Sequence, residues 1–239
     1  MRKFLARSLG LVPFHRTLRD LRTRRRQRID HARWEAAGRP MPPPHLAKQL
    51  ALREIAREHG LRILVETGTY HGDMVEALRR DFERVFSIEL GEDLHRRAVA
   101  RFLKVRNVRL VQGDSAAKLP EIVAELDRPA LFWLDGHYSA GITARGDEDT
   151  PVFKELDAIL QAPDLGHVIV IDDARDFGTD PAYPTLEQIR ERVLARWPDR
   201  VFCVENDAIR ILPGATPKTD PNQSHPPRSS HEQGRPTPG

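Results

Sequence analysis

The sequence predicts an α/β fold in which helices cover both faces of a doubly wound, mostly parallel sheet. Short apolar runs alternate with segments of helical spacing from residue 45 to residue 212, which is the pattern of successive strand–helix–strand units. Carboxylates directly follow two of these runs, Asp135 after one and Asp172 with Asp173 after the next. A turn that contains Gly68 separates the first run from the following helix. Sheets with such turns often bind a ligand at the carboxyl ends of their strands.

The individual elements are predicted in chain order from the same patterns. Residues 45–59 have helical spacing, and Gly60 is a typical residue for ending that helix. The strand and helix patterns that follow imply right-handed crossovers within one parallel sheet. Strands are predicted at 62–66, 84–89, 108–112, 130–135 and 167–172, and helices at 73–80, 92–103, 115–126 and 151–160.

The C-terminal part is predicted to close the sheet and then to lose regular structure. A helix at 185–197 leads into an apolar run at 200–205, and Asn206-Asp207 separates that run from 208–212. Two runs joined by such a turn predict a hairpin. Residues 213–239 are rich in proline, serine and other polar residues, a composition that predicts a disordered tail.

The N-terminal residues 1–44 form a basic arm and a proline-rich linker that precede the predicted domain at 45–212. Residues 1–39 carry a net charge of +9, whereas the whole chain carries +3. The linker, Gly38–Pro44, is too rich in proline for a regular helix. Two interpretations of the arm stay open: a surface helix that makes weak contact with anionic membranes or nucleic acid, or a solvated extension.

Length and composition limit the class of protein. A chain of 239 residues suits one medium-sized α/β domain with extensions. Cys203 is the only cysteine, so an internal disulfide or a thiolate metal site is excluded, and a cytoplasmic location is expected. No stretch of the sequence approaches the roughly 18 apolar residues of a membrane span.

The turn after the first strand has the residue types of a cofactor site. Glu66, Gly68, Tyr70 and Gly72 lie in or directly before it, and its glycines allow a cofactor to approach the backbone closely. The third glycine of a dinucleotide-binding turn is missing. A carboxylate before the turn disfavours a pyrophosphate but suits a cationic sulfonium and an amino group. The sequence therefore favours S-adenosylmethionine over a nicotinamide dinucleotide.

Two further carboxylates lie at the ends of the next strands. Glu89 ends the second strand, where it can accept hydrogen bonds from both ribose hydroxyls. Asp114 and Ser115 follow the third strand, where the aspartate can meet an adenine amino group. Either acid alone could instead be solvated or cap a helix.

With these residues in register, the chain resembles the class I S-adenosylmethionine-dependent methyltransferases over roughly residues 61–212. The resemblance implies a Rossmann-like sheet of seven strands with the last strand antiparallel. It also implies that Glu66, Gly68 and Gly72 line the methionine end of the cofactor, that Glu89 binds ribose, and that Asp114 with Ser115 lies at the adenine.

The three aspartates after the later strands predict a metal site. Converging carboxylates repel one another unless a cation joins them, and Mg²⁺ prefers oxygen ligands. Asp135, Asp172 and Asp173 are similar to the acids of metal-dependent O-methyltransferases of the catechol and of the macrolide or aminocoumarin sugar type. His137 stands where the sugar-modifying members have a second acid, so it is a candidate general base or a metal ligand. The alternative for the aspartates is helix capping or ion pairing, as between Asp173 and Arg175.

These patterns lead to one favoured function and two alternatives. We expect an S-adenosylmethionine-dependent O-methyltransferase, assisted by a divalent metal, that acts on a small hydroxylated acceptor such as a sugar or glycoconjugate precursor. Residues 138–149 are a candidate substrate lid. The alternatives are an RNA methyltransferase that uses the basic arm, or a non-catalytic membrane- or partner-binding module on the same fold. A homo-oligomer stays open.

Overall fold

Seven strands form one mixed sheet in the computed structural model, which describes residues 12–136 and 151–214 and their side chains from residue 21 onward. The strand order is β3-β2-β1-β4-β5-β7-β6. Neighbouring strands from β3 to β5 are parallel, whereas β7 is antiparallel to both β5 and β6. The strands are β1 (Ile63–Thr67), β2 (Arg84–Glu89), β3 (Val108–Gln112), β4 (Leu131–Leu134), β5 (Val168–Ile171), β6 (Val201–Glu205) and β7 (Ala208–Leu212).

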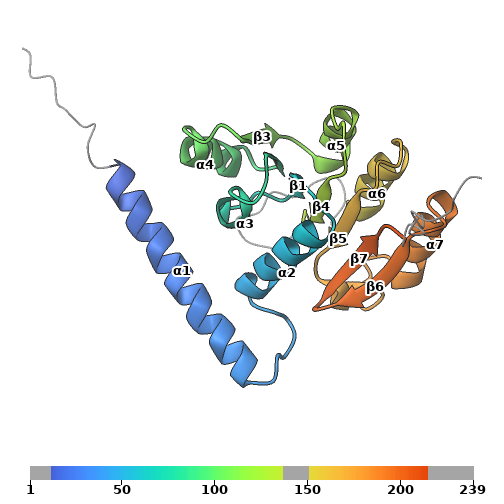
Figure 1. The fold of residues 1–239 in the computed structure, drawn as a ribbon, viewed down its shortest axis with the longest axis horizontal. Coiled ribbons are helices and arrows are strands. Elements are labelled where there is room, and N and C mark those ends of the chain that lie inside the picture. The colour runs from blue at the N-terminus through green and yellow to red at the C-terminus, as the bar shows by residue number, and fades with distance from the viewer. Residues whose placement is uncertain (1–11, 137–150, 215–239) are drawn as a thin grey trace, which may run out of the picture.

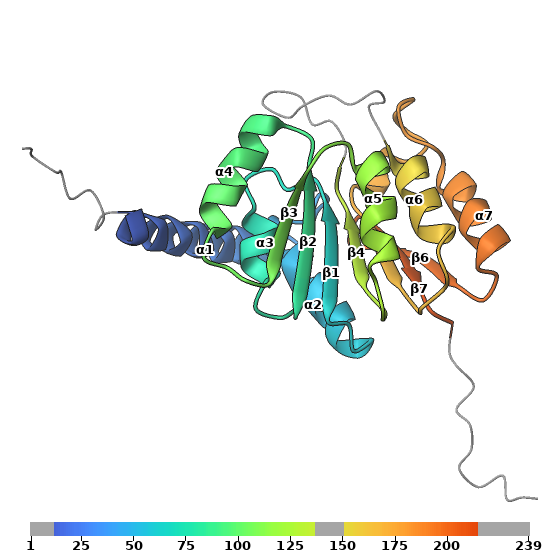
Figure 2. The same ribbon diagram turned by 90° about the horizontal axis from the view of Figure 1, so that it is seen from above.

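Helices cover both faces of this sheet (Figures 1 and 2). Helices α2, α3 and α4 pack on one face, and α5, α6 and α7 pack on the other. None of the described helices has a stretch long and apolar enough to cross a bilayer. The helices are α1 (Val12–Ala36), α2 (His45–Glu58), α3 (Asp73–Leu78), α4 (Glu92–Phe102), α5 (Ser115–Ala124), α6 (Val152–Leu160) and α7 (Leu186–Arg196), with a short 3₁₀ helix η1 (Ala174–Asp176) after β5.

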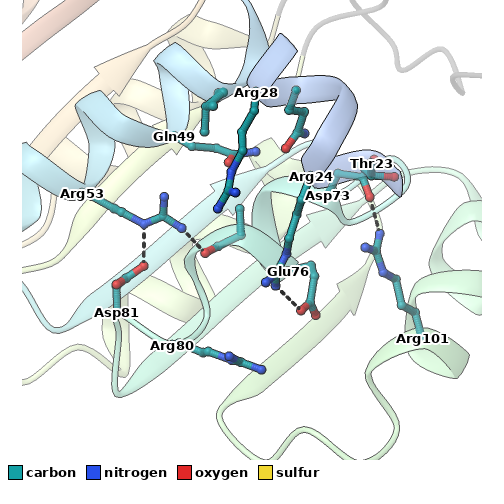
Figure 3. Close-up of a pocket in the computed structure, with 13 residues that line it drawn as sticks. Thr23, Arg24, Arg28, Gln49, Arg53, Asp73, Glu76, Arg80, Asp81 and Arg101 are labelled. Atoms are coloured by element: carbon teal, nitrogen blue, oxygen red, sulfur yellow. Dashed lines mark hydrogen bonds and ion pairs between the residues drawn. The ribbon is translucent and has the colours of Figure 1, made fainter. Parts of the chain in front are cut away.

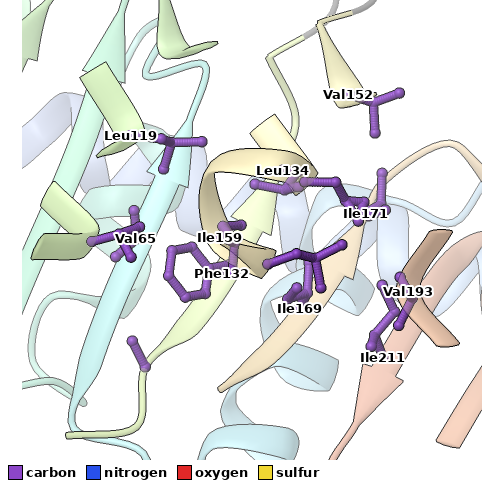
Figure 4. Close-up of a cluster of buried hydrophobic side chains, with 14 of the residues drawn as sticks. Val65, Leu119, Phe132, Leu134, Val152, Ile159, Ile169, Ile171, Val193 and Ile211 are labelled. Atoms are coloured by element: carbon purple, nitrogen blue, oxygen red, sulfur yellow. The ribbon is translucent and has the colours of Figure 1, made fainter. Parts of the chain in front are cut away.

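The core consists of two apolar layers that the strands supply alternately. Phe132 and Leu134 of β4 belong to the layer beneath α5, α6 and α7 (Figure 4). Leu131 and Trp133, from the same strand, belong to the layer beneath α2, α3 and α4. Because both faces are covered, all four residues of β4 are buried. This explains why the strand reads as a continuous apolar run.

The predicted doubly wound sheet with an antiparallel last strand is confirmed. Strand bounds differ from the predicted ones by one residue at several ends. In particular, Asp135 and Asp172 lie directly after β4 and β5 and are not part of them. The hairpin predicted around Asn206-Asp207 is also present, and both turn residues have positive φ, 51° and 61°.

Most of the predicted basic arm is a helix. Helix α1 comprises 25 residues, and none of its described side chains is buried. It runs alongside α2 and α3, and the indole of Trp34 fixes its end by donating a hydrogen bond to Pro40 O at 2.7 Å. Residues 1–11 of the arm and residues 215–239 of the tail lie outside the described residues. The division into arm, domain and tail stays a prediction.

Candidate cofactor and metal site

The turn after β1 has a backbone that only glycine can adopt at Gly68. The φ angle of Gly68 is +86°, and a Cβ atom there would lie 2.4 Å from the carbonyl oxygen of Asp135. The amides of Gly68 and Thr69 both donate to Ile88 O at 3.0 Å, which fixes the turn to β2. The turn after β1 therefore lies directly against the residues that follow β4.

Glu89 is bound to the same turn. Its carboxylate accepts hydrogen bonds from the amide of Tyr70 at 2.7 Å and from the amide of Gly91 at 2.8 Å. Tyr70 has a positive φ of 49°, which is unusual for a residue other than glycine, and the residue is 44% exposed. The carboxylate that was predicted to bind ribose is thus buried beside the cofactor turn, and each oxygen retains a lone pair for a second donor.

Glu66 is a buried carboxylate next to this turn. The hydroxyl of Ser87 donates to Glu66 Oε2, and Ser87 Oγ lies 2.5 Å from Thr69 Oγ1. Burial, and to a lesser extent the charges of Asp135 and Glu89, raise the pKa of Glu66 to about 8. The sequence analysis missed Ser87, although a polar residue inside the otherwise apolar strand β2 was a visible signal.

The remaining predicted cofactor residues lie at the same edge of the sheet. Gly72 has a left-handed backbone at the start of α3, and a Cβ there would lie 2.7 Å from the ring of Phe102. Asp114 Oδ1 accepts a hydrogen bond from the amide of Ala116 at 2.9 Å, so it does cap α5, and Ser115 is the first residue of that helix. Contact of Asp114 and Ser115 with adenine stays a prediction.

The three aspartates after β4 and β5 come together as one cluster. One carboxylate oxygen each from Asp135, Asp172 and Asp173 lies within 4.8 Å of the others. Parallel pairing of β4 with β5 produces this convergence, because both strands end at the same edge. Asp173 has a positive φ of 55°, and this bend in the backbone follows directly after Asp172.

A lysine that the sequence analysis missed lies against this acid cluster. Lys48 of α2 donates to Asp172 Oδ2 at 2.5 Å and lies 3.4 Å from Asp173 Oδ1. Although burial alone would lower it, the surrounding aspartates raise the pKa of Lys48. The sequence carried no local signal for this contact, since 124 residues separate Lys48 from Asp172.

The acid cluster fits a divalent cation despite this lysine. Burial raises the pKa of Asp172 even with Lys48 beside it. Asp172 Oδ1 is also buried and has no hydrogen-bond partner in the part of the chain that the structure describes. Arg175 pairs with Asp173 at 2.8 Å, as the alternative interpretation expected. Among the described residues, these three carboxylates lie beside two cationic side chains, and carboxylate oxygens are the ligands that Mg²⁺ prefers.

The predicted base and the predicted lid lie outside the described residues. These are His137 and residues 138–149. The described residue before them, Gly136, lies in a crowded position. A Cβ at Gly136 would lie 2.9 Å from Glu155 Oε1 and 3.0 Å from Thr67 Oγ1. A Cβ at this point would therefore force Glu155 or Thr67 to shift.

Comparisons with known proteins agree with this architecture. No protein-family model matches the chain. Over 127 residues the chain is 34% identical to protein-L-isoaspartate O-methyltransferase 1 of Anaeromyxobacter sp. (strain Fw109-5), a match that covers 51% of this chain and 58% of that protein. The chain thus spans little more than half the length of this relative.

Three solved structures are similar in fold over most of the chain. They are the O-methyltransferase TomG of Streptomyces achromogenes with SAM, an O-methyltransferase of Bacillus cereus with SAH, and the SAH-bound methyltransferase PaMTH1 of Podospora anserina. Their TM-scores are 0.53, 0.50 and 0.52, and their sequence identities are 18%, 18% and 14%. The matches cover 79%, 74% and 89% of this chain, and 89%, 86% and 97% of theirs. With the observed strand order and the antiparallel β7, these likenesses show that the chain has the class I S-adenosylmethionine-dependent methyltransferase fold.

Proposed function

We propose that the chain is an S-adenosylmethionine-dependent O-methyltransferase that uses a divalent cation to methylate a small hydroxylated acceptor, such as a sugar or glycoconjugate precursor. One observation carries the proposal. The acid cluster of Asp135, Asp172 and Asp173 contains an unpartnered, buried carboxylate oxygen. The backbone of Asp135 lies against the cofactor turn at Gly68. A methyl donor and an acceptor hydroxyl would therefore meet at one edge of the sheet.

Each predicted residue has a role in this scheme. When bound, S-adenosylmethionine supplies a methyl group on a sulfonium. Glu66 faces the cationic end of the cofactor, Glu89 binds the ribose, and Gly68 and Gly72 leave room for the backbone to approach it. Tyr70 covers the turn, while Asp114 and Ser115 border the adenine.

The acid cluster would act on the acceptor. Its three aspartates would hold a divalent cation, and that cation would lower the pKa of a bound hydroxyl group. Lys48 limits the repulsion among these carboxylates and orients Asp172. His137 is proposed as the base that takes the hydroxyl proton. The single cysteine suits a reducing, cytoplasmic compartment.

The acid cluster also favours one class of acceptor. The relative from Anaeromyxobacter is named for transfer to an isoaspartate, whose carboxylate is anionic. An isoaspartyl carboxylate carries no proton for a metal and a base to remove, whereas a hydroxyl group does, so the proposed site suits a hydroxyl acceptor. The proposal therefore expects turnover with polyhydroxylated acceptors and little turnover with an isoaspartyl peptide.

A methyl-transfer assay with a panel of acceptors tests this function. We expect activity with Mg²⁺ or Mn²⁺ and a loss of more than tenfold when a chelator is added. Asp172→Asn should lower turnover by roughly 10²-fold, a typical effect of removing a group that acts on the transition state. Asp157→Asn, which breaks a surface ion pair with Arg192, is the matched control. Full activity of the unmodified protein in chelator would exclude the metal mechanism.

A further inference from the structure

A cavity lies away from the acid cluster, between α1 and helices α2, α3 and α4. It has a volume of about 370 Å³ and is lined by residues of α1, α2, α3 and α4 (Figure 3). This volume is within the range of small-molecule sites. We call it the α1 groove. Asp135, Asp172 and Asp173 do not line it, so its contents are separate from the proposed metal site.

The α1 groove is positively charged. Its lining includes five arginines and three acidic residues, a net charge of +2. Three of these arginines are paired within the groove, with distances of 3.5, 2.9 and 2.6 Å. The pairs are Arg24 with Glu76, Arg53 with Asp81, and Arg101 with Asp73.

The other two arginines carry the net charge. Among residues 21–136 and 151–214, neither the side chain of Arg28 in α1 nor that of Arg80 after α3 has a hydrogen bond or an ion pair. Figure 3 shows Arg28 extending from α1 alongside Gln49. Guanidinium groups present several donors in a planar fork, which matches phosphate oxygens well.

A buried amide indicates a ligand independently of the arginines. Gln49 of α2 lines the α1 groove and is only 3% exposed. Its Nε2 is buried, with no acceptor among the described residues. An unsatisfied buried donor is costly and uncommon in native proteins. Because Gln49 lies beside Arg28, we expect an acceptor from a bound ligand to take the hydrogen bond that its Nε2 can donate.

From these residues we propose that the α1 groove binds a small molecule that carries a phosphate group. Arg28 and Gln49 would bind oxygens of the phosphate, and Arg80, which Figure 3 shows farther from Gln49, would pair with a further negative charge of the ligand. Such a ligand would also hold α1 against the domain, because no described side chain of α1 is buried there. The neighbouring Arg101 donates both to Asp73 and to His71 O in the cofactor turn. The ligand would therefore lie next to Arg101, which stabilises the cofactor turn.

Titration calorimetry of the full chain with pyrophosphate tests the proposal without using methyl transfer. We expect saturable binding that weakens about tenfold in Arg28→Ala and in Arg80→Ala, as for loss of a charge-assisted hydrogen bond. Gln49→Met should weaken binding severalfold while leaving the melting temperature of the free protein unchanged or higher. Weaker binding with an unchanged melting temperature would show that the variant loses affinity for the ligand and not its fold.

Arg25→Ala is the matched control, since Arg25 is an exposed arginine of the same helix that does not line the groove. Equal weakening by Arg25→Ala and Arg28→Ala would show a diffuse charge effect and overturn the proposal. Failure of pyrophosphate to bind would overturn it as well.

Phosphatidylcholine vesicles with and without phosphatidylinositol phosphate form a second arm of the experiment, and an RNA oligonucleotide forms a third. Binding to either of these without binding of pyrophosphate would replace the small molecule with a membrane or a nucleic acid.

Discussion

At the scale of single residues, the proton on Glu66 links cofactor binding to pH. With a pKa of about 8, Glu66 is mostly protonated at neutral pH in the free protein. A cationic ligand favours the ionised carboxylate, so its binding should release up to one proton. We expect the affinity for S-adenosylmethionine to rise by up to about tenfold per pH unit toward pH 8, the limit for one released proton. Calorimetry at several pH values measures this slope.

Glu66→Gln is the control for this prediction, because it keeps the shape of the side chain and removes the titration. The variant should show a flatter pH dependence of affinity. The pH dependence of its stability should be flatter as well. Between the ordinary pKa of 4.5 and the folded value of about 8, the folded state binds more protons than the unfolded state. Stability therefore falls as pH rises through this window in the unmodified protein. If affinity and stability depended on pH equally in both proteins, Glu66 would not be the group that titrates.

Replacing Lys48 tests whether lysine alone neutralises the acid cluster or whether the cluster also binds a metal. Lys48→Met removes the ammonium group that contacts Asp172, so in chelator the free energy of unfolding should fall by about 3–5 kcal/mol, as for a broken buried ion pair. With Mn²⁺ present, much of this loss should be recovered. Chemical denaturation with and without the metal measures both effects. Lys118→Met, which breaks a surface pair with Glu121, is the control. No recovery with Mn²⁺ would leave lysine as the cation of the cluster.

At the scale of helices and strands, no described residue of α1 belongs to either core layer. None of its described side chains is buried, and Arg24, which pairs with Glu76 of α3, is half exposed. Removing residues 1–39 should therefore lower the melting temperature by only about 2–4 °C, the shift that corresponds to roughly 1 kcal/mol in a chain of this size. S-adenosylmethionine should still bind. A truncated protein that does not fold would place α1 in the core and move the domain boundary.

The elements that the sequence predicted well are those with a strong local pattern. Strands β2, β3 and β7 match the predicted residues, because apolar runs bounded by polar turns determine them. The acid cluster was foreseen for the same reason, since Asp135 and Asp172 directly follow such runs. The ammonium of Lys48 was not foreseen, because its contact depends on how α2 packs against the sheet. Gln49 was missed likewise, since no local pattern marks it as a buried amide.

At the scale of the whole molecule, the proposed cofactor and metal sites lie at the same edge of the sheet. The strands that end there supply both core layers, so ligands bound at this edge would stabilise the domain as a unit. The same edge carries the three carboxylates of the acid cluster and Glu89, beside the mostly protonated Glu66. Their mutual repulsion is a cost that a bound cation would relieve.

Thermal unfolding measures this relief directly. A divalent cation present at about 100 times its dissociation constant stabilises the folded state by about 2.7 kcal/mol, which corresponds to roughly 5–10 °C in a domain of this size. We expect Mg²⁺ or Mn²⁺ to raise the melting temperature by several degrees and EDTA to reverse the change. Asp172→Asn should abolish most of the increase, and Asp157→Asn should not. Since Asp172 Oδ1 is the buried oxygen without a partner, a full response of Asp172→Asn would mean that the cation binds elsewhere on the protein.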